Sequence, residues 1–173
     1  MGKVYDCLYA GKCIVSTTRE EVIDFIYTEA RMLDEGRFTE WLALWLEDGH
    51  YWMPLNYDQS SPVNETSLLY EDNFMLRLRV DRLNGERTFS QKPKSRCHHV
   101  LQRPFIDEFD AETGEFKTNT SMHYVETRLD TQQLLAVTAT HELKRVDGKL
   151  RIANKKVELL NCDAAFTGIQ LLP

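Results

Sequence analysis

The hydrophobic period changes partway along this chain, and that change most limits the folds available to it. Before about residue 84, apolar residues recur at intervals of three and four, as on one face of a helix. From about residue 99 the pattern is that of strands separated by turns. Helices followed by strands indicate an α+β domain and exclude the alternating units of a parallel sheet. We predict a strongly curved, mainly antiparallel sheet wrapped around about three helices.

Local signals give the expected boundaries of the first elements. Thr18 and Glu21 have capping-box spacing, and Gly36 is placed to end the helix that they begin. A short second helix is expected over residues 38–46, ending near Asp48-Gly49, and a strand candidate, HYWMPL, follows it.

A third helical pattern covers residues 68–85, and the Asp147-Gly148 pair between two strand patterns indicates a hairpin. No linker or repeat divides the chain. We therefore expect an N-terminal arm over residues 1–17 and one domain over residues 18–173.

Composition limits the classes of function. The net charge of −6 offers no basic field for a nucleic acid. No apolar run approaches the roughly 18 residues of a membrane span, and none near the N-terminus resembles a signal peptide. The four cysteines form no paired motif. We expect a cytoplasmic protein with free thiols.

Two kinds of metal site could use the histidines of this chain. Cys97-His98-His99 supplies C-x-H, half of the ligand set of a Rieske cluster, but the second half is absent. A non-haem iron triad would need His123 and His141 to converge with a carboxylate across neighbouring strands. Hydrogen-bonded strand histidines are the favoured interpretation, so no metal ligand is predicted in this chain.

An acid–base pocket inside the curved sheet is the stronger catalytic alternative. Its candidate residues are Asp48, His50, Tyr51 and His99, among which a His–carboxylate pair could act as a general base. The favoured interpretation is that Asp48 belongs to a turn and the aromatic side chains pack in the core.

Other residues are expected to have structural or interface roles. The arginines of the RLRVDRL and KSR segments are expected to form ion pairs, which commonly fix helix against sheet or subunit against subunit. The C-terminal segment is unusually apolar, so we expect it either to fold back on its own chain or to join subunits, and we predict that its removal weakens oligomerisation. The residues assigned these roles are Trp41, Trp45, Trp52, Arg79, Arg82, Arg96, Phe166 and Leu171.

Four segments occur in a characteristic order between about Glu20 and Leu172: YTEARMLDEGRFTEWLALW with DGHYWMP, RLRVDRL, KPKSRCHHV, and LRIANKKVELLN. Together they resemble the small (β) subunit of aromatic-ring-hydroxylating, Rieske-type dioxygenases. Arg96 and His99 fit the family's serine–arginine…histidine pattern, whereas Cys97 and His98 stand where the family varies.

This resemblance implies an NTF2-like cone that carries no cofactor and has no catalytic residues. The large (α) subunit would hold the Rieske [2Fe–2S] cluster and the mononuclear Fe(II), and would dihydroxylate an arene with O₂ and NAD(P)H-derived electrons. Three β subunits would form a trimer beneath three α subunits, as α3β3. The alternatives are a stand-alone NTF2-like dehydratase or isomerase and a small-ligand binding protein.

Overall fold

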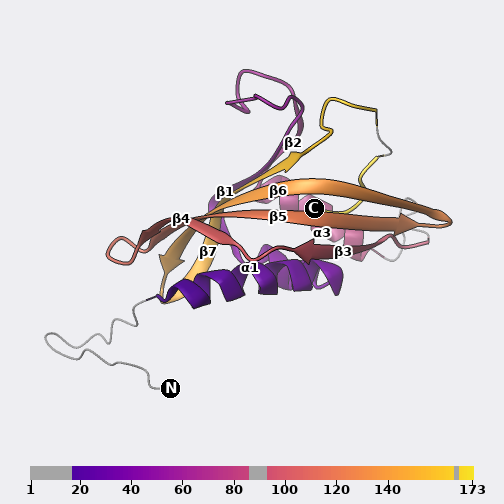
Figure 1. Cartoon of the computed structure of the whole chain (residues 1–173). Coiled ribbons are helices and arrows are strands. Elements are labelled where there is room, and N and C mark those ends of the chain that lie inside the picture. The colour runs from indigo at the N-terminus through magenta and orange to yellow at the C-terminus, as the bar shows by residue number, and fades with distance from the viewer. Residues whose placement is uncertain (1–16, 86–92, 166–167) are drawn as a thin grey trace, which may run out of the picture.

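The computed structural model describes residues 17–85, 93–165 and 168–173. The helices and strands of this part of the chain follow one another in an order that begins with a helix and ends with three long strands (Figure 1). They are α1 (Arg19–Asp34), α2 (Phe38–Leu42), β1 (Trp45–Pro54), β2 (Ser67–Asp72), α3 (Asn73–Asn84), β3 (Arg96–Leu101), β4 (Phe105–Asp110), β5 (Glu115–Arg128), β6 (Thr131–Val146) and β7 (Lys149–Leu159).

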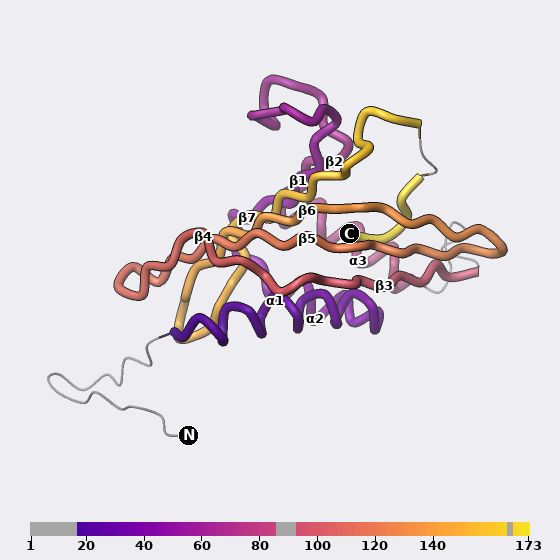
Figure 2. The backbone as a smooth tube through the Cα atoms, viewed as in Figure 1, coloured from indigo at the N-terminus to yellow at the C-terminus, as the bar shows by residue number. Residues whose placement is uncertain are grey.

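The seven strands form one sheet in the order β2-β1-β7-β6-β5-β3, with β4 also paired to β5. All neighbouring strands are antiparallel except β1 and β7, which are parallel. Helix α1 runs along the β3 side of the sheet, and the long β5–β6 hairpin extends beyond the helices (Figure 2). The predicted α+β fold with a curved, mainly antiparallel sheet is confirmed.

Helix α1 begins and ends where the sequence indicates. The Thr18 hydroxyl accepts from the Glu21 N–H at 3.2 Å, and the Glu21 carboxylate accepts from the Thr18 N–H at 3.0 Å. After the helix, Gly36 adopts a φ of 70°, which an L side chain rarely tolerates. The inner face of the helix buries Val22 and Leu33 against the sheet.

The predicted second helix is wrong beyond its first turn. Helix α2 ends at Leu42, and Trp45 begins β1, because the Leu44 carbonyl already accepts from the Ile152 N–H of β7 at 2.8 Å. The expected turn at Gly49 is a bulge inside β1, where a Cβ would lie 3.1 Å from three carbonyl oxygens. In a segment this short, the spacing of the apolar residues fits either a helix or a strand, so the sequence pattern does not distinguish the two.

The third predicted helix is also shorter than expected, because residues 67–72 form strand β2 beside β1. Asp72 then caps α3 through its carboxylate, which accepts from the Met75 N–H at 2.9 Å.

The Asp147-Gly148 hairpin is confirmed, with φ values of 51° and 76°. No helix in the described residues is long and apolar enough to cross a membrane. Of the expected arm, only Thr17 belongs to the described residues.

Candidate functional site

The interior between α1 and the sheet holds a buried cluster of charged and aromatic groups. Glu29 of α1 lies opposite His141 of β6 and Lys155 of β7, which are paired across the two strands. Its carboxylate accepts from Lys155 Nζ at 2.9 Å and from the Trp41 indole N–H at 3.0 Å, and its second oxygen lies 3.2 Å from His141 Nε2. We call Glu29, His141, Lys155 and Trp41 the Glu29 cluster.

The Glu29 cluster is balanced in charge. Burial by itself would raise the pKa of Glu29, but Lys155 and His141 together hold that pKa well below its usual range. Burial lowers the pKa of His141, outweighing the opposing influence of the Glu29 carboxylate. The buried group therefore consists of one anion, one cation and a neutral imidazole, and a proton on His141 would leave an excess buried charge.

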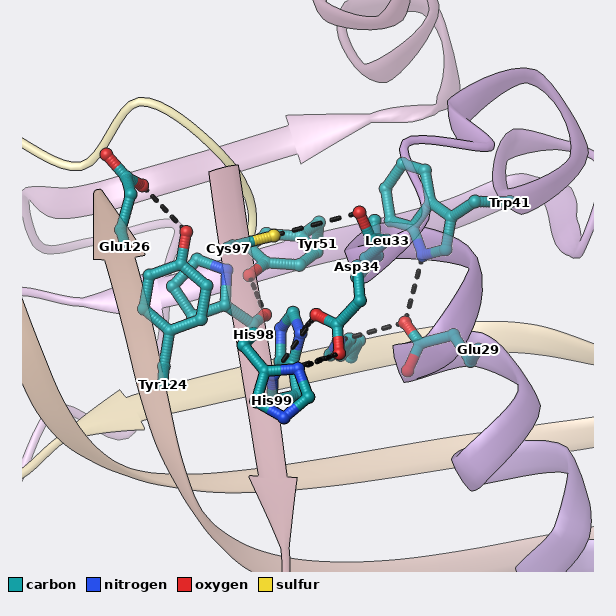
Figure 3. Close-up of polar contacts among 12 residues, drawn as sticks. Glu29, Leu33, Asp34, Trp41, Tyr51, Cys97, His98, His99, Tyr124 and Glu126 are labelled. Atoms are coloured by element: carbon teal, nitrogen blue, oxygen red, sulfur yellow. Dashed lines mark hydrogen bonds and ion pairs between the residues drawn. The ribbon is translucent and has the colours of Figure 1, made fainter. Parts of the chain in front are cut away.

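A second carboxylate–histidine pair lies where α1 ends, and Figure 3 shows it beside strand β3. Asp34 accepts from the His99 backbone N–H, and one carboxylate oxygen lies 2.6 Å from His99 Nδ1. His98 Nδ1 lies 3.1 Å from the other oxygen. The Cys97 thiol donates to the Leu33 carbonyl, and burial raises its pKa to about 12.

The structure does not bring the four pocket candidates together. Asp48 is exposed on β1. The His50 ring stacks on Tyr70 with centroids 5.1 Å apart, whereas Tyr51 points to the opposite face, because side chains alternate along a strand. The buried Tyr51 hydroxyl donates to the backbone oxygen of Pro173 at 2.6 Å.

His99 instead lines a small interior cavity of about 10 Å³, room for about one water molecule. His141 and Thr120 line it too. The buried atoms His99 Nε2, His141 Nδ1 and Thr120 Oγ1 have no hydrogen-bond partner in the part of the chain that the structure describes. His123 is exposed and lines a hollow of about 520 Å³ elsewhere on the sheet, so the histidine pair of the iron-triad hypothesis does not converge.

The predicted aromatic residues lie in and beside the core. Trp41 and Trp45 are buried and pack edge to face with centroids 5.4 Å apart. Trp52 is half-buried, and its indole N–H donates to the Ser67 hydroxyl at 3.0 Å. These contacts account for the aromatic density around residues 41–52 as packing within the chain.

The predicted arginines differ in their surroundings. Arg79 is ion-paired to the buried Glu71 and donates to its two carboxylate oxygens through Nε and Nη2, which ties α3 to β2. Arg82 and Arg96 are exposed. Their roles at an interface stay predictions.

The C-terminal segment folds back on its own chain. Leu171 and Leu172 are buried, and the Glu126 carboxylate accepts from the Gln170 and Leu171 N–H groups at 3.1 Å. Phe166 lies outside the described residues. The fold-back alternative therefore describes where the end of the segment packs, and its part in oligomerisation stays a prediction.

Three charged residues of these clusters were missed by sequence reasoning. Glu29 lies among the apolar positions of α1, and Lys155 shares the alternating inward positions of β7 with Val157. A charge at an otherwise apolar position was the available signal for both. Asp34 carried no such signal, because its partners lie more than sixty residues further along the chain.

Comparisons with known proteins agree with this architecture. The family described as "Ring hydroxylating beta subunit" matches residues 28–164. The chain is 32% identical to the small oxygenase component of the p-cumate 2,3-dioxygenase system of Pseudomonas putida, over 80% of this chain and 77% of that one.

Solved structures show the same fold. The β subunit of benzoate 1,2-dioxygenase from Burkholderia mallei has a TM-score of 0.71 at 22% identity, covering 90% of this chain and 97% of that one. An NTF2-like protein with a cystatin-like fold from Novosphingobium aromaticivorans has a TM-score of 0.57 at 16% identity, covering 83% and 82%. The predicted NTF2-like cone is therefore confirmed.

Proposed function

The chain belongs to the family of ring-hydroxylating dioxygenase β subunits, and we propose that within such an enzyme it is structural and performs no chemistry. Its role is then to support the α subunits that dihydroxylate an aromatic ring. The p-cumate relative, a small oxygenase component, supports this assignment.

The observation that supports the non-catalytic role is that side chains fill the interior of the cone. Where an NTF2-like enzyme would need a substrate pocket, the Glu29 cluster fills the space, and the cavity beside it has room for about one water molecule only. An aromatic ring needs several times that volume. The candidate acid–base residues are separated, and Tyr51 is already bonded to Pro173.

We propose that the partner α subunit supplies the Rieske [2Fe–2S] cluster and the mononuclear Fe(II). The residues of this chain do not fit a Rieske cluster, since Cys97-His98-His99 offers one thiol where two are needed. We further propose an α3β3 hexamer with a β trimer, located in the cytoplasm.

Pocket variants of the assembled enzyme test the non-catalytic role. Asp48→Asn, His50→Gln and Tyr51→Phe should leave turnover per assembled complex unchanged, because none of these groups would touch the substrate. The measurement is product formation normalised to complex isolated by size exclusion. Loss of about 10²–10⁴-fold in a fully assembled variant, the usual contribution of a general acid or base, would contradict the proposal.

Expression of the chain without its partner tests the division of cofactors. The purified chain should be colourless and carry no stoichiometric iron. An iron–sulfur absorption that tracks with the protein through a column would place a cluster in this subunit.

A further inference from the structure

Three potential metal ligands meet where the C-terminal end of α1 touches strand β3, and a fourth lies beside them. The Asp34 carboxylate, the Cys97 sulfur and a ring nitrogen of His99 all lie within 4.8 Å of one another (Figure 3). His98 Nδ1 lies 3.1 Å from the same carboxylate. We propose that these four residues, the Asp34 corner, bind one divalent cation of the zinc type.

The kinds of donor atom favour zinc-like ions. One thiolate, two imidazoles and one carboxylate are all common ligands of Zn²⁺ and of its substitute Co²⁺. Ligand distances of about 2.0–2.3 Å in a tetrahedral site put the donor atoms roughly 3.3–3.8 Å apart. Cation binding would require the 2.6 Å contact between Asp34 and His99 to lengthen and the His98 ring to turn toward the other three ligands, whose donor atoms lie within 4.8 Å of one another.

Hydrogen bonds hold the Asp34 corner together when no cation is bound. The His99 ring and backbone N–H groups both approach Asp34, and the Cys97 thiol donates to the Leu33 carbonyl. A cation would replace the thiol proton, which leaves to solvent, and would take the place of the Nδ1 proton, which moves to the other nitrogen of the His99 ring. The remaining imidazole proton would then reside on His99 Nε2, which lines the small interior cavity with Thr120. Ligating histidines commonly direct their second ring N–H to such a polar neighbour.

The corner is both anchored and accessible. The His99 side chain is 1% exposed, and Asp34 is fixed by the His99 backbone N–H, so two ligands are positioned in advance. The side chain of His98 is 70% exposed, which leaves a path for an ion from solvent. Strand β3 ends the main strand order of the sheet, and a cation there would join it to the end of α1. This is a structural role that goes beyond the proposed dioxygenase function and requires no α subunit.

Titration of the reduced, full-length chain with Co²⁺ tests the proposal. We expect a thiolate-to-cobalt charge-transfer band at one equivalent, together with the intense visible bands of tetrahedral Co²⁺. Zn²⁺ should abolish both, and Zn²⁺ should raise the melting temperature in a manner that chelator reverses. Weak octahedral Co²⁺ absorption without the thiolate band, or no thermal shift with Zn²⁺, overturns the proposal.

Matched variants locate the bound ion. Cys97→Ser should abolish the charge-transfer band, whereas Cys162→Ser, at the other described cysteine, should retain it. His98→Gln should weaken Co²⁺ binding at least about tenfold, and His123→Gln, an exposed histidine of β5, should not. A band that survives Cys97→Ser would place the ion on another thiol and overturn the site. The measurement on the unaltered chain stands even if one variant fails to fold.

Discussion

Two carboxylate–histidine pairs join α1 to the sheet, and they differ in how far the fold has closed them from water. The Glu29 and His141 side chains are each 2% exposed, and Lys155 completes their charge balance. The Asp34 side chain is 17% exposed and carries the exposed His98 on its outer side. The same two chemical groups therefore make a closed interior cluster in one place and an open corner in the other.

The position of each carboxylate along α1 explains the difference. Glu29 lies five residues before the end of the helix and faces β6 and β7 from its buried side. Asp34 is the last residue of the helix, where the chain turns away at the left-handed Gly36. A buried charge must be paired within the protein, whereas a charge at a helix end can exchange its partners with solvent or a ligand.

Removal of the buried cation should have the largest effect on stability. Lys155→Met keeps the apolar stem but leaves the Glu29 carboxylate buried without its cation, which should cost about 3–5 kcal/mol of unfolding free energy. Urea denaturation at neutral pH measures it. The double variant Glu29→Gln/Lys155→Met should recover much of the loss. Lys149→Met, at an exposed position of the same strand, should stay within about 0.5 kcal/mol; an equal loss there would refute the pairing argument.

The closed cluster should also make stability fall as pH decreases. Because burial lowers the pKa of His141, the unfolded chain binds the proton more readily, and stability should decline once pH falls below the ordinary histidine value of 6.5. The lowered pKa of Glu29 adds a further loss below its ordinary value of 4.5. The slope is at most about 1.4 kcal/mol per pH unit for each proton.

His141→Gln separates these two contributions. The variant should flatten the stability profile just below pH 6.5 while leaving the more acidic decline in place. Denaturation measured across this pH range decides it. A profile that keeps its slope below pH 6.5 in the variant would assign that dependence to another group.

The open corner should respond less to loss of charge. Asp34→Asn keeps an oxygen that can accept from His99, so it should cost about 1 kcal/mol, the difference between a charged and a neutral acceptor. Thermal unfolding without added metal measures this cost. A loss as large as that of Lys155→Met would mean that the corner behaves as a buried pair.

The smallest effect is expected at His98. Its ring is mostly exposed, so His98→Gln without metal should change the unfolding free energy by no more than about 0.5 kcal/mol. Chemical denaturation measures it. The same variant is expected to weaken Co²⁺ binding. A variant that lost stability but bound Co²⁺ as tightly as before would give His98 a structural role in place of a metal-binding one.

Several elements of the fold follow from short sequence signals. The Thr18 capping box, the left-handed Gly36 and the Asp147-Gly148 hairpin act within a few residues of themselves, so their local chemistry predicts their conformation. The predictions for residues 43–46 and 68–72 were wrong because their apolar spacing suits a helix or a strand. Pairing with β7 and β1 decided both.

The sequence by itself determined the fold class, the main helix and hairpin boundaries, and the resemblance to the dioxygenase β subunits, since these depend on local spacing and on the order of motifs. Only the tertiary structure decided which charges meet. Glu29 reaches Lys155 across 126 positions, and Asp34 reaches His99 across 65. Such partners are chosen by the curvature of the sheet over α1, which places distant residues at hydrogen-bonding distance and excludes the water that would otherwise solvate them.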